Sequence, residues 1–252
     1  MKFLCVSDQV DPLVYSTSVQ ERYKDIDAVF CAGDLEMEYV DFIVSALGKP
    51  TFFIFGNHDL SDFHLYSKHH EQSEQLSPMT EMEKSHGGDY VSNKVIRCKN
   101  LTFKNSNGKE TPLLIAGVSG SIRYNDGEDQ YTNTQMFFQL LALAPSLIWN
   151  KMRYGRYCDV FLTHASPRHI HDREDPCHKG FKCFNWFIKR FKPALLIHGH
   201  IHLYDLQAPR VTVSGETTVV NAFSHIVIDF KGYSEYKKGE SLGSVISILS
   251  DR

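Results

Sequence analysis

The sequence predicts an α/β fold in which two β-sheets pack together and helices lie outside them. Five short apolar runs are continuous rather than alternating, as expected for strands that are buried on both faces. Segments with helical spacing of apolar residues lie between these runs, which is typical of alternating strands and helices. Further strand-like segments are too many for one simple parallel sheet, so we expect two.

The elements follow from the spacing of apolar residues along the chain. The five runs are residues 3–6, 28–31, 52–55, 160–162 and 194–197. The predicted helices are residues 36–47, 134–152 and 181–191, and the last ends just before Pro193. The further strand-like segments are residues 112–118, 211–213, 217–220 and 225–230. The polar stretch 66–89 is interpreted as a surface excursion, and Asn-Ser-Asn-Gly at 105–108 predicts a turn between two strands.

Composition excludes several classes of protein. Hydrophobic residues make up 42% of the 252 residues, which is an ordinary globular mix, and we expect residues 1–252 to form one domain. The chain has no apolar stretch long enough to span a membrane and no secretory signal, so we expect a cytoplasmic protein without a membrane partner. The net charge of −3 argues against nucleic acid as a partner but is compatible with a small phosphorylated substrate.

Polar side chains follow each of the five apolar runs. In chain order the run ends are Ser7-Asp8, Gly33-Asp34, Gly56-Asn57-His58-Asp59, Thr163-His164 and His198-Gly199-His200-Ile201-His202. Because ligands bind outside the carboxyl ends of strands in α/β sheets, these side chains are expected to meet at one edge. Oxygen and imidazole donors without thiolate suit Mn, Fe, Co, Ni or Zn, and their number is enough for two ions that share a carboxylate.

Each of these run ends would be weak support for a metal site if it stood alone. A Gly-Asp pair after a strand is usually a turn, and a His-x-His pair can pack in a core. Five in this order, each at a strand end, favour a functional site.

The residues at these run ends resemble the motifs of the calcineurin-like metallophosphoesterases, over residues 8–202. The resemblance implies a four-layer α/β/β/α sandwich of two mixed β-sheets flanked by helices, with two divalent metal ions. It also implies hydrolysis of phosphomonoester or phosphodiester bonds by attack of a metal-bridging hydroxide.

The resemblance assigns roles to individual residues. Asp8, Asp34 and His202 would hold one ion. Asp34 would bridge to a second ion, whose other ligands would be Asn57, His164 and His200. Asn57 would also face the substrate. His58 would face the phosphate and the leaving group as a catalytic acid, with Asp59 or a neighbouring carboxylate orienting it.

The first motif departs from the family pattern. The usual Asp-x-His is Asp8-Gln9-Val10 here, and valine cannot ligate a metal. Gln9, Asp11 or water could fill the gap, and we expect water because Asp11-Pro12 can simply turn the chain. Val10 also supports an alternative function, a catalytically weak scaffold of the same fold that binds protein partners.

Arg123 and Tyr124 are candidate substrate-binding residues. They follow the strand-like segment 112–118 and the turn at 117–121, so they could reach the same edge. Arginine contacts phosphate oxygens in a bidentate manner. The alternative, an exposed loop arginine with a surface ion pair, is equally compatible with the sequence.

Overall fold

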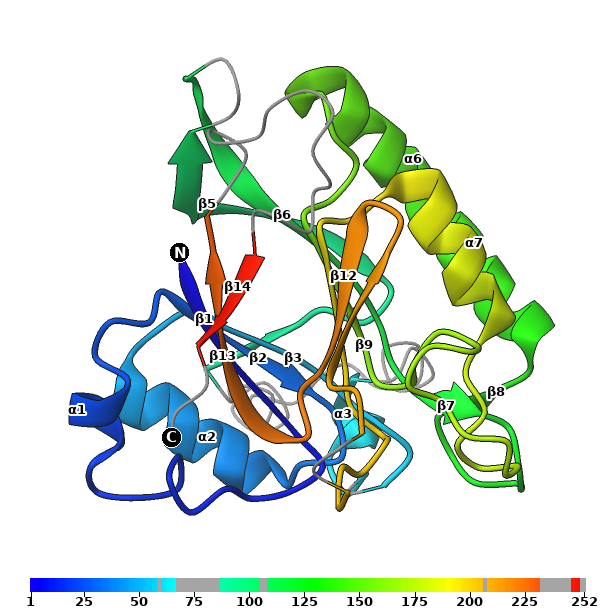
Figure 1. Ribbon diagram of the computed structural model, residues 1–252, viewed down its shortest axis with the longest axis horizontal. Coiled ribbons are helices and arrows are strands. Elements are labelled where there is room, and N and C mark those ends of the chain that lie inside the picture. The colour runs from blue at the N-terminus through cyan, green and yellow to red at the C-terminus, as the bar shows by residue number, and fades with distance from the viewer. Residues whose placement is uncertain (59, 67–86, 105–107, 206–207, 232–245, 250–252) are drawn as a thin grey trace.

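Two six-stranded sheets form the centre of the protein, and helices cover their outer faces (Figure 1). The computed structural model describes residues 1–58, 60–66, 87–104, 108–205, 208–231 and 246–249. The strand order is β14-β13-β1-β2-β3-β4 in the first sheet and β11-β12-β10-β9-β6-β5 in the second. The predicted four-layer α/β/β/α sandwich is therefore confirmed.

The first sheet and its neighbouring helices come mostly from the N-terminal part of the chain. Its strands are β1 (Lys2–Ser7), β2 (Ala28–Ala32), β3 (Thr51–Ile54), β4 (Asp89–Tyr90), β13 (Ser224–Phe230) and β14 (Ile246–Leu249). The neighbouring helices are α1 (Val19–Arg22), α2 (Met37–Leu47) and α3 (Phe63–Tyr66). β1, β2 and β3 are parallel, so their carboxyl ends lie at one edge.

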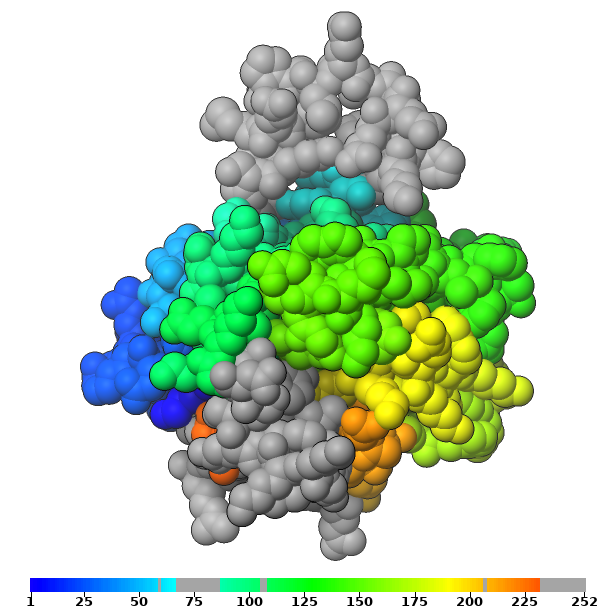
Figure 2. Space-filling model, turned by 90° about the horizontal axis from the view of Figure 1, so that it is seen from above, coloured from blue at the N-terminus to red at the C-terminus, as the bar shows by residue number. Residues whose placement is uncertain are grey.

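The second sheet and its helices contain the remaining elements. Its strands are β5 (Lys94–Lys104), β6 (Glu110–Val118), β9 (Val160–Thr163), β10 (Leu195–His198), β11 (Val211–Ser214) and β12 (Thr217–Asn221). Helices α6 (Asn133–Tyr154) and α7 (Lys182–Phe191) cover it, and β7 (Ser121–Ile122) pairs with β8 (Gln130–Tyr131) beside it. β6, β9, β10 and β12 run parallel to one another. Figure 2 looks onto the outer layer, with α6 in green and α7 in yellow.

The continuous apolar runs are explained by burial on both faces of each strand. In β1, Phe3 and Cys5 pack between the two sheets, whereas Leu4 and Val6 pack beneath α1 and α2. A strand between two apolar layers gains burial energy from every side chain, so apolar–polar alternation is lost.

The helix ends follow local rules. Thr132 caps α6, and its hydroxyl and the Gln135 side chain form a reciprocal capping box. α2 ends at Gly48, with a φ of 58° that favours glycine. No helix in the described part of the chain is both long and apolar enough to cross a bilayer.

The predicted elements agree with the structure to within about two residues at each end. β5 was expected only as an unbounded strand before the turn at 105–108, and residues 105–107 of that turn lie outside the described residues. Most of the predicted surface excursion, residues 67–86, also lies outside them.

Candidate metal centre

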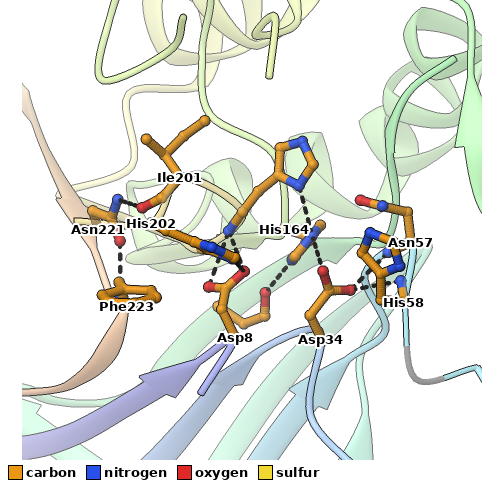
Figure 3. Close-up of polar contacts among 12 residues, drawn as sticks. Asp8, Asp34, Asn57, His58, His164, Ile201, His202, Asn221 and Phe223 are labelled. Atoms are coloured by element: carbon orange, nitrogen blue, oxygen red, sulfur yellow. Dashed lines mark hydrogen bonds and ion pairs between the residues drawn. The ribbon is translucent and has the colours of Figure 1, made fainter. Parts of the chain in front are cut away.

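The carboxyl ends of strands from both sheets meet at one edge and bring the predicted polar residues together (Figure 3). Neighbouring loops are tied by backbone hydrogen bonds, Asp8 N–H to the Gly33 carbonyl at 3.1 Å and Gly199 N–H to the His164 carbonyl at 3.0 Å. Asp8, Asp34 and His200 have φ values of 63°, 51° and 66°. Non-glycine residues seldom adopt this left-handed conformation, and it is concentrated at functional sites.

Two glycines are required by close packing around Asp34 and Asp8. A Cβ on Gly56 would lie 2.0 Å from Asp34 Oδ1, and a Cβ on Gly199 would lie 2.5 Å from Asp8 Oδ2. Both distances are far below ordinary contact, so a larger residue would displace the carboxylate.

Asp34, His164 and His200 direct three ligand atoms at one point. His164 Nε2 lies 3.3 Å from Asp34 Oδ2 and 3.1 Å from His200 Nδ1. Two donor atoms that each lie about 2.1 Å from one ion are about 3.0–3.4 Å apart at angles between octahedral and tetrahedral. The two distances from His164 Nε2 therefore fit ligands of a single ion, and all three atoms lie within 4.8 Å of one another.

The hydrogen bonds of the outward-facing ring nitrogens determine which histidine nitrogens are available to a metal. His164 Nδ1 lies 2.8 Å from the Ala32 carbonyl and His200 Nε2 lies 2.7 Å from the Cys177 carbonyl. A carbonyl oxygen only accepts, so both of these nitrogens carry protons. The lone pairs of neutral imidazole are then on His164 Nε2 and His200 Nδ1, facing the Asp34 carboxylate. Second partners of this kind are the usual way in which a protein orients metal-binding histidines.

The charge states of Asp34, His164 and His200 are compatible with binding of a cation. Burial lowers the pKa of His164, but the adjacent Asp34 carboxylate outweighs it and raises the pKa to about 9. Burial acts to raise the pKa of Asp34, and the His164 imidazole lowers it well below its usual range. Burial lowers the pKa of His200 to about 4. A proton on His164 balances the carboxylate, and a divalent ion could take its place.

Asp8 and His202 lie next to this cluster. The Asp8 side chain is fully buried, and its two oxygens accept from the His200 N–H at 2.8 and 3.0 Å. His202 Nε2 lies 3.7 Å from Asp8 Oδ1, and its ring packs on Phe223 with centroids 5.1 Å apart. These are two of the three ligands that the resemblance assigns to the first ion.

Asn57 and His58 lie on the other side of Asp34 (Figure 3). Their backbone N–H groups donate to Asp34 Oδ1 at 2.9 and 2.8 Å. Asn57 Nδ2 donates to the Tyr124 hydroxyl at 3.3 Å, but its buried Oδ1 has no hydrogen-bond partner among the described residues. A buried amide oxygen without a partner is costly, and a metal ion would satisfy it. The His58 side chain is exposed.

The two candidate substrate-binding residues, Arg123 and Tyr124, differ in their contacts with the cluster. Tyr124 reaches the centre through Asn57. The Arg123 side chain is exposed, and its guanidinium donates to the Gln130 carbonyl at 3.4 Å. No contact between Arg123 and the cluster is present in the described part of the chain. Asp59 lies outside the described residues.

The position left by the missing first-motif histidine is not taken by Asp11. Asp11 Oδ1 accepts from the Leu13 N–H at 2.8 Å and turns the chain, and Oδ2 accepts from Ser224 and His225. The carboxylate is therefore committed to β13, which agrees with the expected turn. Gln9 and Val10 are exposed.

Several residues that support the centre give little indication of it in the sequence. Asn221 donates from Nδ2 to the Ile201 carbonyl at 2.7 Å and so braces the loop between the two candidate ligands His200 and His202. Asp129 is buried with a φ of 51°, and burial raises its pKa to about 7. The buried His198 Nε2 lies 2.8 Å from His171 Nδ1, so His198 is a hydrogen-bonded core histidine.

Comparison with known proteins agrees with this geometry. The family model for calcineurin-like phosphoesterases matches residues 1–204. The chain belongs to this family. Among solved structures of the calcineurin-like fold, TT1561 of Thermus thermophilus has a TM-score of 0.56 at 15% identity, with 98% of this chain and 97% of that chain covered. A second crystal structure has a TM-score of 0.57 at 15% identity, covering 90% of this chain and 93% of its own. No curated protein matches the sequence.

Membership of the calcineurin-like family supports metal-dependent hydrolysis of phosphoesters, since family members typically bind divalent metals. Asp34, His164 and His200 fit such an ion in this chain. The two solved structures are too distant in sequence to show more than the fold.

Proposed function

We propose that the chain is a phosphoesterase with a dinuclear centre that hydrolyses small phosphorylated substrates. The convergence of Asp34 Oδ2, His164 Nε2 and His200 Nδ1 on one point supports this most directly. In the metal-free chain a proton on His164 Nε2 lies between Asp34 Oδ2 and His200 Nδ1, and a divalent ion could take the place of that proton.

The proposed first ion would be held by Asp8, Asp34 and His202, with water at the position left by Val10. The proposed second ion would be held by Asp34, Asn57, His164 and His200. The orphaned Oδ1 of Asn57 and the oxygen-and-imidazole donor set support Mn, Fe, Zn, Co or Ni. Two ions, when bound, would polarise the phosphoryl group and lower the pKa of a water between them.

The chain itself would position the substrate and supply the proton for the leaving group. The N–H of His58 is fixed on Asp34 and its side chain is exposed, so the imidazole would be accessible to a phosphoester bound at the centre. From there the imidazole would donate a proton to the leaving oxygen. Asn57 and Tyr124 would orient the phosphate from the adjacent wall, whereas Arg123 would need to leave the Gln130 carbonyl to take part.

A panel of p-nitrophenyl phosphate and bis(p-nitrophenyl) phosphate, run with Mn, Fe, Co, Ni and Zn, tests this proposal. We expect metal-dependent turnover, and a loss of at least about 100-fold in Asp34→Asn because one side chain serves both ions. Asp25→Asn is the matched control, since Asp25 is exposed and precedes β2 at the opposite end of the sheet. Equal turnover in both variants would contradict the assignment.

The alternative is a catalytically weak scaffold for protein partners, and Val10 favours it. Metal uptake without turnover of either ester would support the scaffold. Turnover that depends on His58 would exclude it, because a scaffold has no use for an exposed proton donor beside a metal centre.

A further inference from the structure

Helix α6 has an apolar face that points out of the protein. Its inner face, with Met136, Leu140, Leu143 and Leu147, is buried against the second sheet. The outer face carries exposed apolar side chains at positions 138, 141, 145, 148, 149 and 152. At 3.6 residues per turn these positions fall within an arc of about 100°. Figure 2 shows α6 lying uncovered across this face of the molecule.

The exposed side chains are large. Phe138 is 63% exposed and Met152 is 74% exposed, and Leu141, Ile148 and Trp149 lie between them. An outer helix of a globular protein normally turns a polar stripe to water, so an apolar ridge of this length marks a contact surface.

The Trp149 side chain is fixed in position on this apolar ridge of α6. The Arg97 guanidinium of β5 stacks on the Trp149 ring at 4.5 Å, and Arg97 Nε donates to Asn150 Oδ1 at 2.6 Å. The indole is therefore fixed in place while 45% of the residue remains exposed. Tryptophan at this boundary of apolar and charged groups is typical of side chains that rest at a membrane interface.

Charge is strongly segregated around the ridge. The segments 94–104, 133–154 and 182–191 contain four, two and three Lys or Arg residues and no Asp or Glu. The whole chain, in contrast, has 27 basic and 30 acidic residues. The layer formed by β5, α6 and α7 is therefore positive on a protein that is negative overall.

Two shallow hollows of about 500 Å³ each flank the ridge. One lies at the C-terminal end of α6, and Lys99, Lys109, Glu110 and Arg153 are among its lining residues. The other lies along α7 and is lined by Lys182, Asn185, Trp186, Lys189 and Arg190. Both place cationic groups beside an apolar surface, an arrangement that suits the phosphates of a lipid bilayer.

We propose that the outer face of α6, with its basic flanks, docks on an anionic phospholipid bilayer. Two copies of this chain would bring two predominantly positive layers together, which opposes self-association through this face. Single-stranded nucleic acid is bound by aromatic rings along a basic groove, whereas Phe138 and Trp149 stand on a convex helix among the aliphatic side chains of Leu141, Ile148 and Met152. An apolar stripe between basic residues is the pattern of helices that lie in the membrane interface.

Bilayer docking differs from the expectation that the chain has no membrane partner. That expectation was drawn from the lack of a spanning segment and of a secretory signal, and neither detects a surface on which apolar and basic residues are grouped. The docking does not depend on the proposed hydrolysis.

Sedimentation of the full chain with large vesicles tests the proposal. We expect binding to phosphatidylcholine vesicles that contain phosphatidylglycerol, little binding to phosphatidylcholine alone, and weaker binding at high salt. The Phe138→Glu/Met152→Glu variant should bind at least about tenfold more weakly. Lys189→Gln and Arg190→Gln should each cost about fivefold. Val213→Glu, at an exposed apolar residue on β11, is the matched control and should bind as the unaltered chain does.

Tryptophan emission provides a second readout that does not depend on the stability of the charged variants. The chain has two tryptophans, and in Trp186→Phe only Trp149 reports. Its emission should shift to the blue on addition of anionic vesicles. The proposal is overturned by absence of vesicle binding or of the shift, or by equal binding of the Phe138→Glu/Met152→Glu variant. A dimer that this variant dissociates, or competition of RNA for the same face, would also overturn it.

Discussion

Replacement of Gly56 by alanine adds a single methyl group at the tightest point of the candidate metal centre. The new Cβ would lie 2.0 Å from Asp34 Oδ1 and 2.6 Å from His164 Cε1, where ordinary contact begins at 3.4 Å. The Asp34 carboxylate would therefore have to move by about 1 Å or more, because a close-packed site has no slack to absorb the overlap. The φ of Gly56 is not positive, so alanine meets no backbone strain there.

The displacement translates into a large loss of function and a moderate loss of stability. Ligands must stay within about 0.5 Å of productive geometry, and a misplacement of about 1 Å costs about 100-fold in rate. We expect Gly56→Ala to lower kcat/KM for p-nitrophenyl phosphate with Mn²⁺ by at least about 100-fold. Overpacking should lower the free energy of unfolding by about 1–3 kcal/mol.

Gly48→Ala separates the two effects. Gly48 ends α2 with a φ of 58°, and a Cβ there meets no atom within 4 Å. This variant should lose about 1 kcal/mol of stability through backbone strain and keep its activity. The measurements are kcat/KM, calorimetric Mn²⁺ affinity and Tm of both variants. The geometry of the centre would be refuted if Gly56→Ala kept the activity and metal affinity of the unaltered chain.

Further predictions concern the proton donor, pH and the supports of the centre. His58→Ala should slow hydrolysis of esters with poor leaving groups far more than hydrolysis of p-nitrophenyl esters. If the substitution slowed both kinds of ester by the same factor, His58 would not act as the acid for the leaving group. For the metal-free protein, the folded-state pKa of His164 at about 9 lies above the ordinary 6.5, so its stabilising proton is fully present below pH 6.5. Tm in EDTA should thus fall as pH rises from 6.5 to 9, and His164→Gln should abolish that slope. The pKa of Asp34 is lowered, so its contribution is present above pH 3.8 and is lost below it as the carboxylate takes up a proton. Asn221→Ala leaves the Ile201 carbonyl without its donor and should weaken metal binding by about 10–100-fold, and an unchanged titration curve would argue against this support. Burial raises the pKa of Asp129 from 3.8 to about 7, so the cost of its ionisation grows over that range and Asp129→Asn should raise Tm more at pH 8 than at pH 5.

The central strands can be predicted from the sequence because both of their faces are buried. In residues 3–6, Phe3 and Cys5 meet the opposite sheet and Leu4 and Val6 meet the helices, so no position is free to be polar. β5 gives a weaker indication because it is an edge strand with a bulge between Cys98 and Thr102 and half-exposed side chains.

The candidate ligands can be predicted for a related reason. Asp34, His164 and His200 each follow a buried strand, and parallel strands bring such residues to one edge. The supports are harder to predict. The Cys177 carbonyl that orients His200 is a backbone group, so the type of residue at this position gives no indication of its role. Arg123 illustrates the reverse case, since its position after a strand did not bring its side chain into contact with the described cluster.

The outer face of α6 shows what net charge conceals. A chain whose charges nearly cancel can still gather its basic residues on one layer, and only the arrangement of β5, α6 and α7 reveals this. The apolar spacing of residues 134–152 predicts the helix, but an arc on the outer face and an arc on the inner face look alike until the sheet is in place.

Anomalous scattering from crystals soaked in Mn²⁺ is the most direct measurement of the metal centre. We expect two peaks, one among Asp34, Asn57, His164 and His200, and a second that Asp34 shares with Asp8 and His202. Peaks confined to other parts of the molecule, or an empty centre after soaking at a pH where His164 is neutral, would contradict this expectation.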